Sequence, residues 1–155
     1  MLNNIEKALL SGNIREVNIL LGHCYFLKGK VIHGRQLGRT LGFPTANLML
    51  TENSTPLPAH GVYAVRVEHH QTFYNGMVNI GIRPTFNLPE LTIEVNLFDF
   101  SSDIYGHHLT LFFIDHVRDE MKFPDLESLK LQLSNDRLFI LNLLNNWNQT
   151  NTCPK

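Results

Sequence analysis

Residues 25 to about 115 have the pattern of many short β-strands separated by turns. Apolar side chains alternate with others along these segments, as in strands that bury one face. Two sets show this alternation most clearly: Tyr63, Val65 and Val67, and Ile93, Val95 and Leu97. Further strands are expected over residues 74–80 and 109–114. Several short strands in succession predict a mainly β fold, a small antiparallel barrel.

Helical patterns flank the strands. Residues 5–10 and 14–21 have the pattern of short helices, and the second begins after Asn13 with Glu16 three residues on and ends at Gly22. A C-terminal helix is expected to begin at Pro124-Asp125, with apolar residues at helical spacing. We therefore expect a helical linker over residues 1–22, a barrel with its C-terminal helix over 23–147, and a flexible tail over 148–155.

Composition excludes several functional classes. The chain has 155 residues and a formal net charge of −1, so it has no basic field for a nucleic acid. No apolar stretch approaches the length of a membrane span, and the N-terminus lacks a signal-peptide pattern. Cys24 and Cys153 are the only cysteines and are expected as free thiols. We expect a cytoplasmic monomer with no nucleic-acid or membrane partner.

A glycine- and arginine-rich stretch precedes two small oxygen-bearing side chains. Residues 34–40 are Gly-Arg-Gln-Leu-Gly-Arg-Thr, and residues 41–47 are Leu-Gly-Phe-Pro-Thr-Ala-Asn. Glycines permit close backbone approach and guanidiniums suit phosphate oxygens. Thr45 and Asn47 would share one face of an extended segment and offer hard neutral oxygens to Mg²⁺. The alternative is a loop in which Pro44 fixes a turn and both side chains only bond backbone. The Walker and Gly-x-Gly-x-x-Gly patterns are absent.

More motifs follow this loop in order. They are Gly-Val-Tyr-Ala at 61–64, Asn-Ile-Gly-Ile-Arg-Pro-Thr-Phe at 79–86, Ile-Glu-Val-Asn-Leu-Phe-Asp-Phe at 93–100, Asp-Ile-Tyr-Gly at 103–106 and Arg-Asp-Glu-Met-Lys-Phe at 118–123. With Pro-Thr-Ala-Asn at 44–47, nearly the whole chain resembles the riboflavin kinases, specifically the C-terminal kinase module of bacterial bifunctional FAD synthetases. The resemblance implies a Greek-key barrel and transfer of the ATP γ-phosphoryl group to riboflavin, with Mg²⁺, giving FMN and ADP.

The resemblance also implies roles for individual residues. The implied sites are nucleotide binding at Gly34, Arg39, Thr45 and Asn47, Mg²⁺ binding at Thr45 and Asn47, catalysis at Glu94, and flavin binding at Arg118, Glu120 and Phe123. Glu94 would be the general base. The strand pattern alone favours a solvated, outward-facing Glu94, and the residue types also allow a surface ion pair for Arg118 and a packing role for Phe123. Asn96 departs from the family, where histidine is more common.

Three further expectations concern the rest of the chain. Residues 79–86 are expected as a mobile flap over the site, although a plain hairpin connection would use the same residues. The histidine pairs at 69–70 and 107–108 are expected as exposed side chains, because neighbours in a strand point opposite ways. The chain is expected to stop at FMN, since it has no domain resembling the adenylyltransferase. A flavin-binding module without turnover and a fragment of a larger synthetase are the alternatives.

Overall fold

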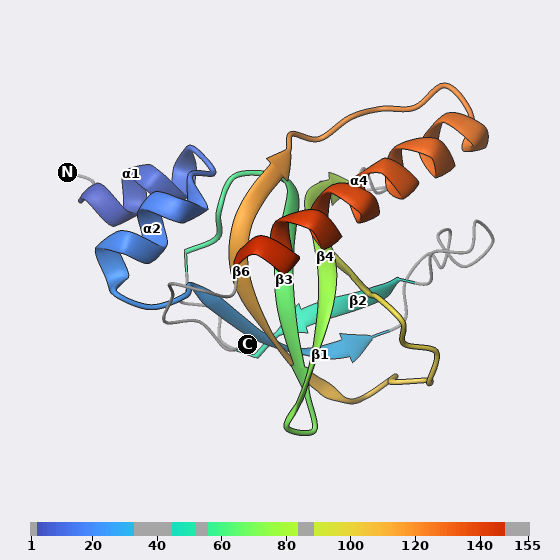
Figure 1. Ribbon diagram of the computed structural model, residues 1–155, viewed down its shortest axis with the longest axis horizontal. Helices are drawn as coiled ribbons and strands as arrows, with labels where there is room; N and C mark the ends of the chain where they lie inside the picture. The colour runs from blue at the N-terminus through green and yellow to red at the C-terminus, as the bar shows by residue number, and fades with distance from the viewer. Residues whose placement is uncertain (1–2, 33–44, 52–55, 84–88, 148–155) are drawn as a thin grey trace.

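In the part of the chain that the structure describes, six antiparallel strands close into a barrel. This computed structural model describes residues 3–32, 45–51, 56–83 and 89–147 (Figure 1). The strands are β1 (Phe26–Ile32), β2 (Ala46–Leu50), β3 (Gly61–His69), β4 (Thr72–Arg83), β5 (Glu90–Leu97) and β6 (His108–Arg118). Their order around the barrel is β1-β2-β5-β4-β3-β6. Because β6 returns beside β3 after the β3-β4-β5 meander, the predicted mainly β Greek-key barrel is confirmed.

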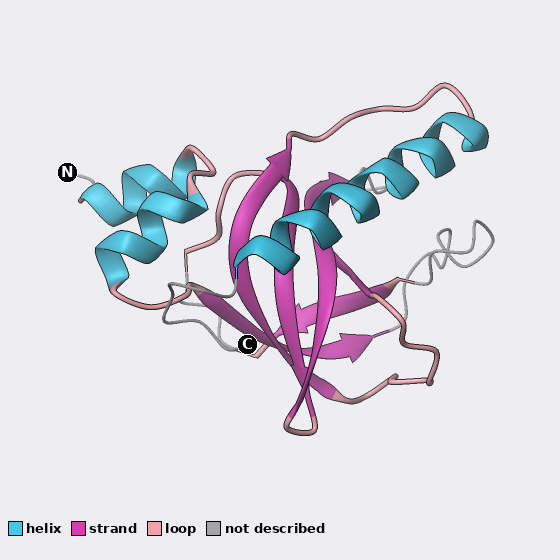
Figure 2. Cartoon of the chain, in the orientation of Figure 1, coloured by secondary structure: helices cyan, strands magenta, loops and turns pink. Residues whose placement is uncertain are grey.

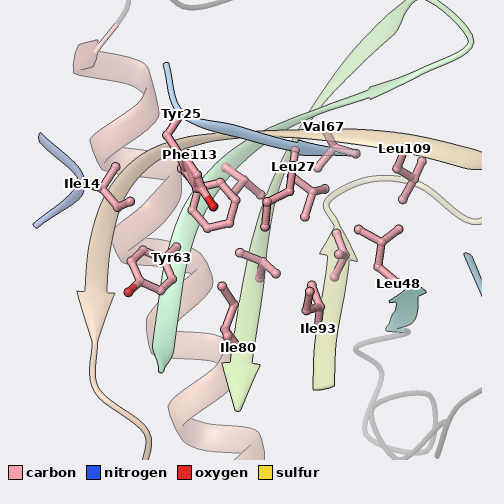
Figure 3. Packing of buried hydrophobic residues seen from close by; sticks show 14 of the residues in the cluster. Ile14, Tyr25, Leu27, Leu48, Tyr63, Val67, Ile80, Ile93, Leu109 and Phe113 are labelled. Atoms are coloured by element: carbon pink, nitrogen blue, oxygen red, sulfur yellow. The ribbon is translucent and has the colours of Figure 1, made fainter. Parts of the chain in front are cut away.

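Alternate side chains of every strand fill the barrel interior. Tyr63, Val65 and Val67 are fully buried, and Val95 on β5 is too. The rings of Tyr63 and Phe113 meet edge to face with centroids 5.4 Å apart. Figure 3 shows Tyr63, Val67 and Phe113 among the side chains that point into the interior from several strands. The alternation in the sequence therefore identifies the interior faces of β3 and β5.

The helix α4 (Leu126–Trp147) covers part of the outside of the barrel. Ile140 and Leu144 are buried in a second apolar cluster, with outward-facing residues of three strands: Val62, Ala64, Met77 and Ile114. Figure 2 shows α4 lying across the strands. The helix is preceded by Asp125, whose side chain accepts a hydrogen bond from the backbone N–H of Ser128 at 2.7 Å. That bond lowers the pKa of the Asp125 carboxyl.

The two N-terminal helices, α1 (Asn4–Leu10) and α2 (Ile14–Leu21), match the predicted positions. Asn13 Oδ1 accepts a hydrogen bond from Glu16 N at 3.2 Å, and Gly22 ends α2 in the left-handed conformation. Ile14 and Val17 are fully buried and join the interior core. Together with α4, these make three helices in the described ranges, and none is both long and apolar enough to cross a membrane.

The expectation of a free thiol is wrong for Cys24. This residue lies just before β1, is 2% exposed and is disulfide-bonded. Asn18 Nδ2 approaches its sulfur at 3.7 Å and donates to the carbonyl of Phe113 at 2.9 Å. Cys153 lies outside the described ranges.

Candidate active site

Three polar side chains form a row across β2, β5 and β4 on the outside of the barrel. Asn47 pairs directly with Glu94, and Glu94 pairs directly with Asn79. Directly opposed residues have Cβ atoms about 4.5–5.5 Å apart, so the three side chains are in contact range. Their chain neighbours belong to the interior core: Leu48, Val95, Val78 and Ile80. The row therefore faces outward, and Glu94 lies between two carboxamides.

The row is partly shielded from water. Asn47 is 8% exposed, and Glu94 and Asn79 are half-buried. Glu94 does face outward, as the strand pattern allowed, but it is not the fully solvated side chain of that alternative. Asn79 Oδ1 is buried and accepts no hydrogen bond from any described residue. An unsatisfied buried acceptor costs about 1–3 kcal/mol, so a hydrogen bond donated to Asn79 Oδ1 by a bound molecule would remove this cost.

Sequence reasoning did not assign a role to Asn79. It placed residues 79–86 in a flap, but residues 79–83 belong to β4 and pair with β5. That part of the expectation is wrong, and residues 84–86 lie outside the described ranges. The spacing of Asn79 and Gly81 could have indicated this role. They are two residues apart, so they share the outer face of one strand.

Thr45 lies next to the row. It immediately precedes β2, is half-buried and stands two residues before Asn47. A hydroxyl oxygen and a carboxamide oxygen beside the Glu94 carboxylate form a hard, all-oxygen donor set, which suits Mg²⁺. The donors present therefore fit this ion. Gly34 and Arg39 lie outside the described ranges.

Glu120 stands over Gly81. A Cβ placed on Gly81 would lie 2.7 Å from Glu120 Oε1, so the carboxylate occupies the space that a side chain would take. Gly81 and Asn79 lie on the same face of β4, roughly 7 Å apart along the strand. The structure thus brings Glu120, from the segment after β6, to the same outer surface as the row.

Arg118 makes an ion pair, but not on the surface. Its Nε lies 3.1 and 3.0 Å from the two Asp136 oxygens, and its Nη2 lies 2.9 Å from Oδ2. The Arg118 side chain is 14% exposed and that of Asp136 only 3%. The guanidinium carbon lies 5.8 Å from the ring centroid of Phe123, which is half-buried. Arg118 therefore ties the segment carrying Glu120 and Phe123 to α4.

Comparison with known sequences gives a consistent set of relatives. The Flavokinase family model, described as riboflavin kinase, matches residues 21–144. The bifunctional riboflavin kinase/FMN adenylyltransferase of Bacillus subtilis (strain 168) is 46% identical over 136 residues, covering 86% of this chain and 43% of that protein. The protein of the same name from Escherichia coli (strain K12) is 39% identical over 135 residues, covering 86% and 42%. The chain spans less than half the length of these relatives.

Two solved structures share the fold. A protein from Streptococcus pneumoniae, named as a macrolide-efflux protein, matches with a TM-score of 0.84 and 42% identity, covering 89% of this chain and 45% of that one. The riboflavin kinase from Trypanosoma brucei matches with a TM-score of 0.55 and 26% identity, covering 79% and 80%. The pneumococcal name differs from those of the other relatives, although the level of identity is similar.

Proposed function

Because this chain belongs to the riboflavin kinase family, as the counterpart of the kinase module of bifunctional enzymes, we propose that it transfers the γ-phosphoryl group of ATP to the ribityl 5′-hydroxyl of riboflavin. The proposal rests on one observation. A carboxylate, Glu94, is held between the carboxamides of Asn47 and Asn79 on a partly buried face of the barrel.

Glu94 would act as the general base. Its carboxylate would accept the proton of the 5′-hydroxyl as that oxygen attacks the γ-phosphorus, with ADP leaving on the opposite side. Asn79 would orient the ribityl chain, because its buried oxygen can accept from a substrate hydroxyl. Both side chains come from paired strands, which hold them more precisely than loops do.

Asn47 and Thr45 would hold Mg²⁺ with the nucleotide. When bound, this ion neutralises the charge of the phosphate oxygens and helps to align the transferred group. The chain's own part is to present two neutral oxygens at the start of β2, one of them from Asn47, which pairs directly with Glu94. Gly34 and Arg39 would cradle the phosphates from the preceding segment.

The flavin would lie on the side of Glu120 and Phe123. Phe123 offers an aromatic face for an isoalloxazine ring, and Glu120 offers a carboxylate acceptor beside Gly81. Arg118 would support this side by its bond to Asp136 rather than by a charge contact with the flavin. This changes the role implied by the resemblance from direct contact to positioning.

An enzyme explains the site better than a passive flavin carrier does. A carrier needs neither a carboxylate beside the ribityl end nor oxygen ligands for a metal, and both occur in one row. The absence of adenylyl transfer by this chain, its cytoplasmic location, its monomeric state and the division into residues 1–22, 23–147 and 148–155 remain our proposals.

The test is an assay of the purified chain with riboflavin, ATP and Mg²⁺, with FMN and FAD separated by chromatography. We expect FMN and ADP to accumulate at a rate that depends on Mg²⁺. A Glu94→Gln preparation made in parallel controls for a contaminating kinase. Flavin binding without any FMN from the native chain would favour the carrier.

A further inference from the structure

Three histidines converge at the turn between β3 and β4. His69 ends β3, His70 follows it in the turn, and His107 precedes β6. One ring nitrogen from each lies within 4.8 Å of the others. The expectation of exposed side chains is wrong for His69 and His107, which are half-buried, whereas His70 is exposed. His69 and His70 do not point apart, because His70 is in a left-handed turn with φ 49° and not in a strand. Its ring stacks on His69 with centroids 4.0 Å apart.

His69 and His107 already face each other through ring nitrogens. Nε2 of His69 and Nδ1 of His107 are 2.8 Å apart, and the two rings are within 7° of parallel. One nitrogen donates its proton and the other accepts it. If the donor ring moves its proton to its other nitrogen, both facing atoms present lone pairs.

The surroundings of His69 disfavour its charged form. Burial lowers the pKa of the His69 imidazole, and repulsion from His70 and His107 lowers it further. A neutral imidazole is the form that binds metals. His70 is exposed, so one side of the cluster remains open to water.

We propose that His69, His70 and His107 form a binding site for a divalent transition-metal ion such as Zn²⁺ or Ni²⁺. Imidazole nitrogens suit these ions, and zinc commonly binds three histidines and a water. With Zn–N bonds near 2.0–2.1 Å, tetrahedral ligand nitrogens lie about 3.3 Å apart. The observed range, from 2.8 Å to at most 4.8 Å, lies on either side of that value, so rotation of the side chains could complete the site.

This site is separate from the row that carries Glu94. His69 pairs with Thr72 at one end of the β3-β4 hairpin, and Asn79 lies seven residues further along β4. At about 3.3 Å per residue, the two places are roughly 23 Å apart. A bound ion would connect the hairpin turn to the segment before β6, which makes it a structural clip and not part of phosphoryl transfer. Mg²⁺, which prefers oxygen, would not compete for it.

The test is calorimetric titration of the untagged, chelator-treated chain with Ni²⁺ or Zn²⁺. Matched variants are His70→Gln and His107→Gln, with His108→Gln as a control, because His108 is exposed and outside the cluster. We expect one ion per native chain and per His108→Gln chain. In His70→Gln and His107→Gln the Kd should be higher by roughly tenfold or more. Circular dichroism checks that each variant is folded, and His70 is at an exposed turn where a change of side chain is tolerated.

Three results would overturn the proposal. They are no saturable binding by the native chain, unchanged affinity in both cluster variants, and an equal loss in the His108→Gln control. Added metal should also raise the Tm of the native chain more than that of His107→Gln at the same metal concentration, since the stabilisation by a bound ion grows with its affinity.

Discussion

Replacing Asp136 by asparagine should lower the unfolding free energy by about 3 kcal/mol. Both Asp136 oxygens accept from Arg118, at 2.9 to 3.1 Å, and Oδ1 also accepts from Gln132 at 2.9 Å. Asparagine removes the negative charge and turns one acceptor into a donor that faces the guanidinium. Removing one partner of a buried pair costs about 3–5 kcal/mol. We take the lower end of this range because the Arg118 side chain is 14% exposed and also donates a hydrogen bond to the Asp119 carbonyl.

Urea and thermal unfolding measure this cost. At about 2–4 °C per kcal/mol for a chain of this size, the Tm should fall by roughly 6–12 °C. Asp99→Asn is the matched control: it breaks a pair with Arg137 of similar length, 3.0 Å, but the side chains are 84% and 33% exposed. Its cost should stay below about 1 kcal/mol. Equal costs in the two variants would refute the reasoning that burial, and not the contact itself, sets the magnitude.

The remaining predictions concern the site. Glu94→Gln should lower kcat by roughly two to four orders of magnitude with little effect on substrate binding; near-native kcat would exclude a base at this position. Thr45→Ala or Asn47→Ala should weaken Mg-ADP binding in calorimetry and leave riboflavin binding less affected, and unchanged Mg-ADP affinity would disprove the ligand assignment. Gly81→Ala should displace the Glu120 carboxylate and raise the riboflavin KM, with little change in Tm because that side chain is exposed and can move; an unchanged KM would remove Glu120 from the flavin side. With excess ATP the chain should release no pyrophosphate and form no FAD, and either product from a contaminant-free preparation would require a second site.

The faces of the strands could be predicted from the sequence because strand side chains alternate with a period of two. The C-terminal end of β4 could not be predicted from the sequence. Gly81 and Pro84 are typical of turns, so the expected strand stopped at Ile80, whereas β4 continues to Arg83. Glycine suits position 81 because the Glu120 carboxylate occupies the space that a side chain would need. This contact joins residues far apart in the chain, so local sequence patterns do not reveal it.

The row of polar residues shows a similar limit. Periodicity indicates that Glu94 faces outward, but only the register between strands shows that Asn47 and Asn79 flank it. The histidines differ for a local reason: alternation holds within β3, but His70 lies in a left-handed turn just beyond it. A rule that is valid for a strand fails at the first residue after the strand.

The position of the site follows from how the barrel is filled. Large side chains occupy the interior, so we propose that substrates bind at the outer surface. There α4 covers faces of β3, β4 and β6, and the row crosses β2, β5 and β4, with β5 in the middle. The β2-β5 junction has only two registered pairs, whereas the other junctions have four to nine in the described residues. The proposed metal ligand Asn47 and the proposed base Glu94 form one of those two pairs, so the contact that we propose to join the nucleotide and flavin sides lies at the junction with the fewest registered pairs among the described residues.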